Sequence, residues 1–388
     1  MNGMRRRLLF DAGDYPVSQQ AASGLAVRIA ELAETLADEF AVTVYSPDVP
    51  DPMHLGGARL ERRADRWGDL LADTDAVFFF DVADPDRLAQ AVAAGPLIVS
   101  ETAPPIEHGS YPSLLRQDAP EERYREILEA YQRQLRASHH FICRSRVERA
   151  TILASLVTLG RIGVRDLAGS ATLDHLVTSV PIGFSRHSRL VVERTTPAPL
   201  ADVLWTGGVW SFYDPHLLVD AVAICARRGL RISAAFLYGQ PHPDTREIVE
   251  ALEKRIADRA VGDLVTVVRQ PVTHQARDAY LTGARAFVCV ARPGVENDTC
   301  VRLRIRDSRL YGVPLIVDGF GATADEVRRH GLGRVLDEPS AETLAEALAE
   351  TIAARTPGGA EDAFEYRDDL WGLVPRLHDL LGRVDDQR

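Results

Sequence analysis

Arginines and carboxylates crowd one segment in the second half of the chain. Arg302, Arg304 and Arg306 are separated by single residues. Glu296 precedes them and Asp307 directly follows them. The segment follows an apolar run typical of a buried strand, at the edge where α/β proteins bind ligands. Guanidinium groups bind phosphate through paired hydrogen bonds, and a helix start adds free N–H groups, so the pattern favours a diphosphate site.

The same segment has a plainer interpretation as a salt-bridged surface helix. Alternate residues cannot share one face of a helix. Under either interpretation we therefore expect at least one of Arg302, Arg304 and Arg306 to be solvated.

A pair of glycines marks a second loop that follows a strand. Gly207 and Gly208 lie in the sequence Trp-Thr-Gly-Gly-Val-Trp-Ser-Phe-Tyr-Asp-Pro, residues 205–215. Glycines let the backbone approach a phosphate or a sugar closely. The Asp214–Pro215 pair is equally well explained as the cap and first residue of a helix. A Gly-Gly pair alone is weak evidence for a ligand site.

The first half of the chain repeats the loop-to-helix arrangement after its first strand. Gly24 begins a helical pattern and could bring its backbone to a ligand, with Arg28 one turn further on. The structural alternative is a helix cap followed by a surface ion pair between Arg28 and Glu31.

A proline-containing loop, residues 101–108, follows another strand of the first half. His108 could donate a proton to a substrate oxygen or a leaving phosphate, and Glu101 or Glu107 could orient a sugar hydroxyl. A single loop histidine is more often structural or solvated. His108 is nevertheless the catalytic candidate of this half.

Several familiar catalytic and cofactor motifs are absent from the sequence. It has no P-loop lysine motif, no Gly-x-Ser-x-Gly elbow and no His-Glu-x-x-His motif. The dinucleotide fingerprint does not follow the first strand, and the His139–His140 pair has no evident third metal ligand. We therefore expect neither a metal site nor a resident cofactor.

Composition and charge narrow the class of protein. A formal net charge of −11 argues against a general nucleic-acid binder, which needs basic surface. No apolar stretch reaches the roughly 20 residues that span a bilayer. The basic start, residues 1–7, lacks the apolar length of a signal peptide. The 4 scattered cysteines are typical of reduced thiols, so a soluble, cytoplasmic protein is expected.

Short apolar runs alternate with longer amphipathic stretches, the pattern of an α/β protein with parallel strands joined by helices. Because 388 residues exceed one hydrophobic core, we expect two domains. These are an N-terminal Rossmann-like domain at residues 1–185 and a C-terminal one at residues 200–365, with a polar linker between them. Residues 366–388 are expected to form a helix that packs back toward the first domain.

The apolar runs also place the individual strands. In the first half they fall at residues 7–11, 42–45, 76–80, 97–100, 141–143 and 176–181. In the second half they fall at residues 203–206, 234–238, 265–269, 286–290, 314–317 and 333–336. The helix of the arginine segment is expected over residues 301–311.

Four segments, in this order, resemble a bacterial subgroup of the family-four glycosyltransferases found in polysaccharide and natural-product gene clusters. Residues 24–33 resemble the subgroup's first helix, Gly-Pro-x-Ile-Arg-x-x-Glu-Leu-Ala. Residues 205–215 resemble its Trp-Gly-Gly-Gly-Ile-Trp-x-Trp-Phe-Asp-Pro loop, and residues 239–243 its Gly-x-x-His-Pro loop. Residues 302–314 resemble Arg-x-Arg-Ile-Leu-Asp-Tyr-x-x-x-Gly-x-Pro. The likeness covers nearly the whole chain.

The resemblance implies a GT-B architecture, two doubly wound Rossmann-like domains facing across a cleft. It implies retaining, metal-independent transfer of a sugar from a nucleoside-diphosphate sugar to a small-molecule or glycan acceptor. By the same likeness, Arg302 and Arg304 would face the diphosphate, with the Gly207–Gly208 pair beside it. Asp307 would bind the ribose, and Glu296 occupies the region of the family's first acidic residue.

The sequence also departs from the subgroup. Ala291 and Arg292 stand where a histidine is usual, and Gln270 replaces a common tryptophan. Two alternatives therefore stay open: a catalytically degenerate protein that binds a sugar nucleotide or a partner, and an epimerase or hydrolase, or unusual coupling, on the same fold. The nucleotide base, the sugar, the acceptor and a homodimeric state are left open by the sequence.

Overall fold

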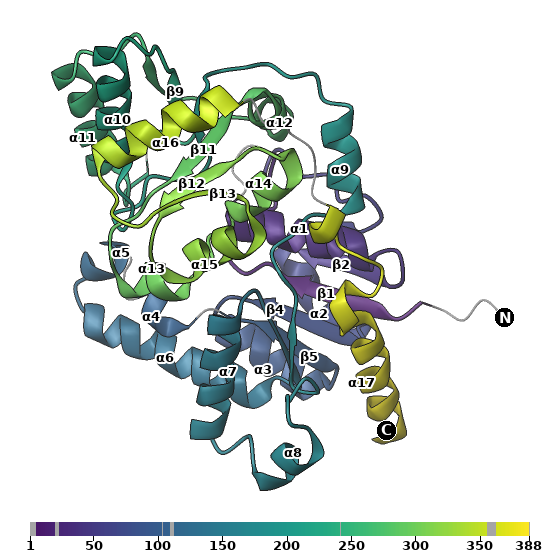
Figure 1. Ribbon diagram of the computed structural model, residues 1–388. Coiled ribbons are helices and arrows are strands. Elements are labelled where there is room, and N and C mark those ends of the chain that lie inside the picture. The colour runs from purple at the N-terminus through teal and green to yellow at the C-terminus, as the bar shows by residue number, and fades with distance from the viewer. Residues whose placement is uncertain are drawn as a thin grey trace. The chain divides into compact units, whose positions relative to one another are not determined.

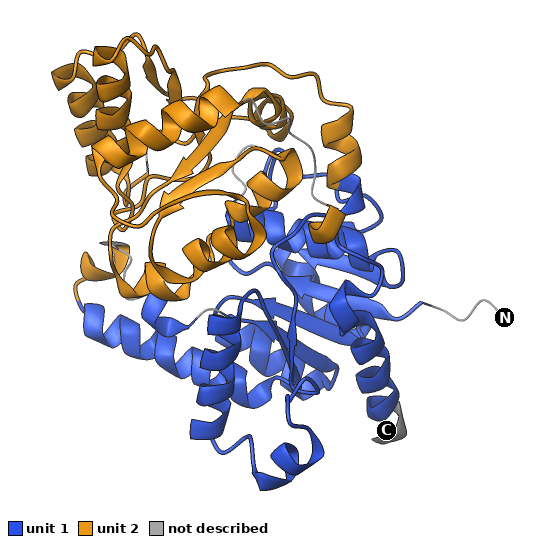
Figure 2. Ribbon diagram, viewed as in Figure 1, with its two compact units in different colours: residues 1–108, 119–187, 366–388 blue, residues 109–118, 188–365 orange. Residues whose placement is uncertain are grey.

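The chain divides into two compact units, each of which contains one parallel sheet (Figure 1 and Figure 2). The computed structural model describes residues 5–19, 23–102, 104–108, 112–240, 242–354 and 362–387. Unit 1 comprises residues 1–108, 119–187 and 366–388, and unit 2 comprises residues 109–118 and 188–365. The first four residues of the basic start lie outside the described residues.

Unit 1 is built on a seven-stranded sheet in the order β3-β2-β1-β4-β5-β6-β7. The strands are β1 (Arg7–Asp11), β2 (Ala41–Tyr45), β3 (Arg59–Glu61), β4 (Ala76–Phe80), β5 (Leu97–Glu101), β6 (His140–Cys143) and β7 (Val177–Ser179). The helices are α1 (Gly24–Leu36), α2 (Trp67–Ala72), α3 (Pro85–Ala94), α4 (Pro105–His108), α6 (Pro120–Ala137), α7 (Arg146–Thr158), α8 (Val164–Gly169) and α17 (Leu373–Gln387).

Helices cover both faces of this sheet. Successive side chains of a strand point to opposite faces, so each strand contributes to two cores. Along β4, Phe78 and Phe80 belong to the core formed with α1 and α17. Val77 and Phe79 belong to the core formed with α2 and α3. Burial on both faces explains why the central strands are continuous apolar runs.

Unit 2 repeats this architecture on a six-stranded sheet in the order β10-β9-β8-β11-β12-β13. The strands are β8 (Val203–Trp205), β9 (Ala234–Phe236), β10 (Val265–Val267), β11 (Ala286–Cys289), β12 (Leu315–Asp318) and β13 (Gly333–Leu336). The helices are α5 (Pro112–Leu115), α10 (Pro215–Arg227), α11 (Arg246–Asp258), α12 (His274–Gly283), α13 (Val295–Thr299), α14 (Ile305–Tyr311), α15 (Gly321–His330) and α16 (Ala341–Ala354). Helix α10 packs against α11 and α16, and α12 packs against α14.

The α/β class and the parallel sheets are as predicted, but some helices differ. The helix predicted at residues 301–311 begins only at Ile305, because the preceding arginines are drawn to the strand ends instead. Helix α9 (Arg186–Glu193) lies in the stretch predicted to be a polar linker. In the C-terminal segment, a turn at Leu370–Gly372 precedes α17. Among the residues described, no helix has the length and apolar character needed to cross a bilayer.

Candidate functional site

The glycine loop of unit 2 lies directly against the side chain of Arg304. Arg304 Nη2 donates to the Gly208 carbonyl over 2.6 Å, and Nη1 lies 2.9 Å from Cys289 Sγ. The guanidinium carbon is 4.3 Å from the centroid of the Tyr213 ring. A Cβ at Gly207 would come within 2.3 Å of Arg304 Nε, so any larger residue there would force the guanidinium to move. The carboxyl ends of β8 and β11 are thus joined through Arg304.

Arg302 is buried, and both of its terminal nitrogens are engaged by the protein. Asp318, the last residue of β12, accepts from Nη1 over 2.7 Å and from Nη2 over 3.1 Å. The Cys289 carbonyl accepts from Nη1, and the Asn297 side chain accepts from Nη2. Asp318 also accepts from the backbone N–H of Ala291 over 2.7 Å. Arg302 therefore ties the ends of β11 and β12 to α13.

Arg304 differs from Arg302 in keeping hydrogen-bond donors in reserve. Of the five N–H donors of its guanidinium, Gly208 and Cys289 engage two, and no other described residue accepts from it. No carboxylate among the described residues forms an ion pair with Arg304, although its exposed fraction is only 8%. Burial raises the pKa of the neighbouring Tyr213 hydroxyl well above its usual value, so this group stays neutral beside the arginine. The site therefore offers a positive charge with free donors, which suits an anionic oxygen.

None of the three alternating arginines is solvated, contrary to the expectation from helical spacing. Arg302 and Arg304 are 2% and 8% exposed, and the Arg306 side chain is 12% exposed. The argument from spacing fails because Arg302 and Arg304 precede α14 and are not part of a regular helix. Without a regular helix, the two side chains can point in different directions, and each binds its own set of acceptors.

The two candidate acids of the segment, Glu296 and Asp307, are both buried. Asp307 lies in the first turn of α14 and accepts from Arg277 Nη2 over 2.6 Å, with Arg306 Nη1 at 3.4 Å. Arg277 also donates to the Tyr238 hydroxyl over 2.9 Å. Glu296 lies in the first turn of α13 with an exposed fraction of 6%. The carboxylate predicted to bind ribose is thus held in an ion pair.

In unit 1, His108 is paired with an aspartate that the sequence did not single out. His108 Nε2 lies 3.0 Å from Asp81 Oδ1, and the Tyr15 hydroxyl donates to the other oxygen of that carboxylate. Burial opposes protonation of His108, but the hydrogen bond and charge of Asp81 outweigh it and raise the pKa of His108. Burial also opposes ionisation of Asp81, yet the same contact lowers the pKa of Asp81. The contact with Asp81 therefore favours the protonated form of His108, which could give its proton to a substrate.

Arg28 is buried in the interior of unit 1. Its Nη2 donates to Glu101 Oε2 over 2.8 Å and to the Val180 carbonyl over 2.7 Å. Its Nη1 donates to the Pro181 carbonyl over 2.9 Å and to the Tyr366 hydroxyl. Arg28 thus joins α1 to β5, to the residues after β7 and to the C-terminal segment.

The structural alternative of a surface ion pair between Arg28 and Glu31 is wrong, because both side chains are buried. Glu31 is buried and accepts from the backbone N–H of Ser185 over 2.5 Å. The carboxylate of Glu101, considered as a partner of a sugar hydroxyl, is held by Arg28. Gly24 is exposed at the start of α1, whose N-cap is Ser23. Within this motif Gly24 is exposed, whereas the side chains of Arg28 and Glu31 are buried.

The structure therefore brings Gly207, Gly208, Arg302 and Arg304 together in unit 2. It places Gly24 and His108 in unit 1. Asp318 was not among the residues predicted from the sequence, although an acid at the end of a buried strand is a recognisable signal. Among the described residues, no group of at least three His, Cys, Asp or Glu side chains is arranged to hold a metal ion.

Known proteins were compared by sequence and by structure. No protein-family model matches the sequence, and no curated protein matches it. Solved structures match over nearly the full length. Sucrose-phosphate synthase from Thermosynechococcus elongatus has a TM-score of 0.59 at 15% identity, covering 98% of this chain and 100% of that chain.

Two further matches are similar in extent. HepE from Anabaena, in complex with UDP and glucose, has a TM-score of 0.54 at 14% identity, covering 99% of this chain and 98% of that chain. The α,α-trehalose 6-phosphate synthase from Burkholderia multivorans has a TM-score of 0.56 at 12% identity, covering 100% and 99%. These structural neighbours are GT-B glycosyltransferases, and at such identities the likeness shows that this chain has the GT-B fold.

Proposed function

We propose that this chain is a glycosyltransferase that takes a sugar from a nucleoside-diphosphate sugar and passes it to a small-molecule or glycan acceptor. The observation that carries the proposal is Arg304, a buried arginine with uncommitted donors beside a Gly-Gly backbone. Preorganised donors of this kind stabilise the negative charge that develops on a departing diphosphate. The fold shared with sugar transferases, one of them solved with UDP and glucose, supports the same assignment.

Within this proposal the residues take different roles. Arg304 contacts the diphosphate, and Gly207 and Gly208 border it. Arg302 acts as a positioning residue, since Asp318 engages both of its terminal nitrogens. Asp307 orients the ribose. In this role a ribose hydroxyl and the Arg277 guanidinium both donate hydrogen bonds to the Asp307 carboxylate.

The finer assignments rest on the family resemblance of the sequence. We propose membership of the family-four retaining transferases, with catalysis that needs neither a metal ion nor a resident cofactor. Retention is tested by determining the anomeric configuration of the product by NMR. Metal independence is tested by turnover in the presence of EDTA.

The first experiment measures nucleotide binding by the full chain. In a thermal-shift panel with UDP, GDP, dTDP, ADP and their sugar conjugates, one nucleotide should raise the unfolding temperature more than the others. A ligand at ten times its Kd adds about 1.4 kcal/mol of stability. Arg304→Ala should weaken that binding about 30-fold, because a charged hydrogen-bond donor contributes roughly 2 kcal/mol.

Arg334→Ala is the matched control, since Arg334 is an exposed arginine of unit 2 that pairs with Glu350 and has a side chain 54% exposed. Equal losses in the two variants, or a flat response to every nucleotide, would overturn the donor site.

A second candidate, a sugar-nucleotide-binding protein without turnover, is favoured by one observation. Asp307 is already paired with Arg277, which leaves less of the carboxylate for a ribose. Binding of a nucleotide sugar with no transfer, no hydrolysis and no epimerised product would decide for this candidate.

A further inference from the structure

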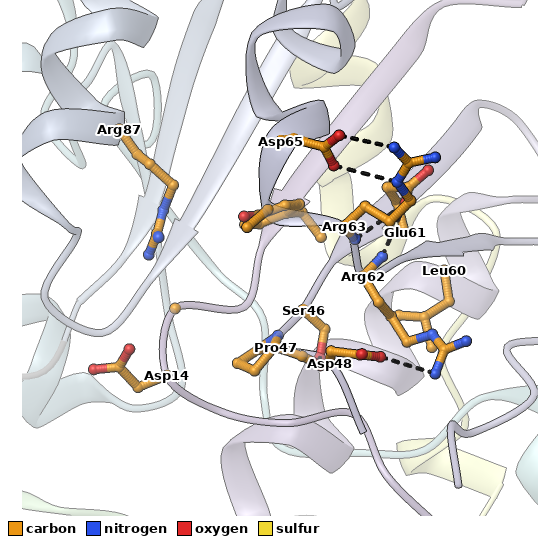
Figure 3. Close-up of a pocket in the computed structure, with 13 residues that line it drawn as sticks. Asp14, Ser46, Pro47, Asp48, Leu60, Glu61, Arg62, Arg63, Asp65 and Arg87 are labelled. Atoms are coloured by element: carbon orange, nitrogen blue, oxygen red, sulfur yellow. Dashed lines mark hydrogen bonds and ion pairs between the residues drawn. The ribbon is translucent and has the colours of Figure 1, made fainter. Parts of the chain in front are cut away.

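Unit 1 contains a cavity of about 630 Å³ at the carboxyl ends of β1, β2 and β3 (Figure 3). Sites for small molecules typically measure roughly 300–1,000 Å³. The lining comes from the loops after the three strands and from the first turn of α3. The lining residues include Asp14, Tyr45, Arg62, Arg63, Asp65 and Arg87.

Arg87 is bound through its Nε atom, and its two terminal nitrogens are left for a ligand. Its Nε donates to Asp11 Oδ2 over 2.8 Å, and Asp11 is 1% exposed. Its guanidinium lies 5.8 Å from the ring centroid of Tyr45 and 5.9 Å from that of Trp67. Neither terminal nitrogen bonds to a residue that the structure describes, and the guanidinium extends toward the side of the cavity where Asp14 lies (Figure 3).

The opposite wall of the cavity is electrically balanced. Arg63 Nη2 pairs with Asp65 Oδ2 at 2.7 Å, and Arg62 Nη1 pairs with Asp48 Oδ1 at 3.2 Å. Glu61 accepts from the backbone N–H of both arginines and pairs with Arg59. These side chains neutralise one another, so the charge selectivity of the cavity is set by the wall that carries Arg87.

That wall carries excess negative charge. Asp11 balances Arg87, which leaves Asp14, an exposed carboxylate with no hydrogen bond or ion pair to the described part of the chain. The carboxylate of Asp84 lies close by and caps the start of α3 by accepting from the Arg87 backbone N–H. A phosphate or carboxylate ligand would therefore be repelled, whereas a neutral or cationic ligand would not.

The polar groups around the cavity supply both hydrogen-bond donors and an acceptor. The Arg87 terminal nitrogens donate, and the Tyr45 hydroxyl has no partner among the described residues. The Asp14 carboxylate accepts. Sugar hydroxyls each donate and accept one or more hydrogen bonds, and the charge argument excludes acidic sugars.

We propose that this cavity binds a polyhydroxylated, sugar-like ligand without a negative charge. Arg87 and Tyr45 donate to its oxygens, and Asp14 accepts from a hydroxyl or an amine. In the proposed transfer reaction such a ligand is the acceptor, and that clause alone rests on the proposed function.

The test uses three probes that share one ring and differ in charge: glucose, glucosamine and glucose 6-phosphate. Saturation-transfer NMR on the full chain, without nucleotide and at about 10 mM probe, should rank glucosamine first, glucose second and glucose 6-phosphate last. Asp14→Ala should weaken glucosamine binding about tenfold and reduce its advantage over glucose. Tyr45→Phe should weaken binding of all three probes.

Asp38→Ala is the matched control, since Asp38 is an exposed aspartate of unit 1 that does not line the cavity. It should leave the ranking and the affinities unchanged, and urea unfolding of each variant checks that the fold persists. Tightest binding of glucose 6-phosphate, no binding of any probe, or equal effects of Asp14→Ala and Asp38→Ala would overturn the proposal. Each probe is also measured on Arg304→Ala, so that a phosphate bound by Arg304 in unit 2 is told apart from one bound in the cavity.

Discussion

The end of β12 in unit 2 and the cavity of unit 1 handle charge in opposite ways. In unit 2, Arg302 and Asp318 form a pair whose side chains are 1% and 0% exposed, and Arg304 lies beside it against a glycine backbone. In unit 1, the pairs around the cavity are solvated: the side chains of Arg63 and Asp65 are 66% and 67% exposed. The end of β12 in unit 2 thus carries buried charge, whereas the loop after β3 in unit 1 carries exposed charge.

The buried pair of unit 2 holds the backbone at the strand ends, whereas the exposed charges of unit 1 can act on a ligand. A buried ion pair is costly to break, because removing one partner leaves the other charge without compensation. An exposed pair contributes little to folding, because water and salt screen it. We therefore expect substitutions in unit 2 to change stability strongly and those around the unit 1 cavity to change mainly ligand preference.

The largest effect is expected from Asp318→Ala. This change strands the Arg302 guanidinium in the interior of unit 2, and losses of this kind cost about 3–5 kcal/mol. Urea unfolding followed by circular dichroism measures the loss. The double variant Arg302→Met with Asp318→Leu is the control and should recover most of the stability, because it removes both charges together. A single variant as stable as the parent would show that the pair does not brace the strand ends.

A smaller effect on folding is expected from Gly207→Ala. The added Cβ would lie 2.3 Å from Arg304 Nε and 2.7 Å from Nη2, so the guanidinium must move. Overpacking of this kind costs about 1–3 kcal/mol, and nucleotide binding should fall with it. Gly262→Ala is the matched control in the same unit, because a Cβ at Gly262 meets nothing within 4 Å. Calorimetric titration with the preferred nucleotide should separate the two variants, and equal affinities would contradict the role of the loop.

The His108–Asp81 pair of unit 1 gives an intermediate effect that depends on pH. The pKa of His108 is raised in the folded state, so protonated His108 adds to the free energy of unfolding. This stabilisation is complete below the pKa of the unfolded chain, about 6.5, and is lost as pH rises through the pKa of the folded protein. The pKa of Asp81 is lowered in the folded state, so ionised Asp81 also stabilises the fold. This stabilisation is complete above the pKa of the unfolded chain, about 3.9, and is lost as pH falls through the pKa of the folded protein. The pair should therefore stabilise the fold fully between roughly pH 4 and 6.5.

Asp81→Asn tests this window. Asn tolerates the left-handed backbone found at Asp81, where φ is 60°. We expect a loss of about 0.5–1 kcal/mol at pH 5.5 that shrinks at pH 9, measured by urea unfolding. A loss that is the same at both pH values would mean that the charge of His108 plays no part.

The smallest effect is expected from Arg63→Ala at the cavity of unit 1. Both members of the Arg63–Asp65 pair are exposed and screened by water, so the free energy of unfolding should stay unchanged within error. The change also leaves Asp65 uncompensated, which should increase the preference for glucosamine over glucose 6-phosphate. A destabilisation comparable with that of Asp318→Ala would remove the contrast between the two sheet edges.

The strands were predictable from the sequence because burial on both faces leaves a strong signal. The run at residues 76–80 coincides with β4 (Ala76–Phe80), and residues 333–336 coincide with β13. The polar edge strand β3 (Arg59–Glu61) was missed, since an exposed edge needs no apolar residues. The GT-B fold was likewise accessible from the order of the sequence motifs.

The ionic partners of the candidate residues were not predictable. Arg302 and Asp318 are 16 residues apart, Arg277 and Asp307 are 30 apart, and Arg28 and Glu101 are 73 apart. Spacing rules for helices relate only residues three or four apart. The choice among many arginines and carboxylates is made by the tertiary fold, which is why Arg302 and Arg304 look equivalent in the sequence and differ in the structure.

The contact between Arg28 and Tyr366 has a consequence for synthesis on the ribosome. Its two residues are 338 positions apart, and Leu370, Leu373 and Leu377 of the same C-terminal segment complete the core above α1. At roughly 5–20 residues per second, α1 emerges about 17–70 s before its partner exists. Every strand of unit 2 is made within that interval. Unit 1 is therefore begun first and finished last, and a nascent chain that stops short of residue 366 carries an open hydrophobic face for a chaperone to cover.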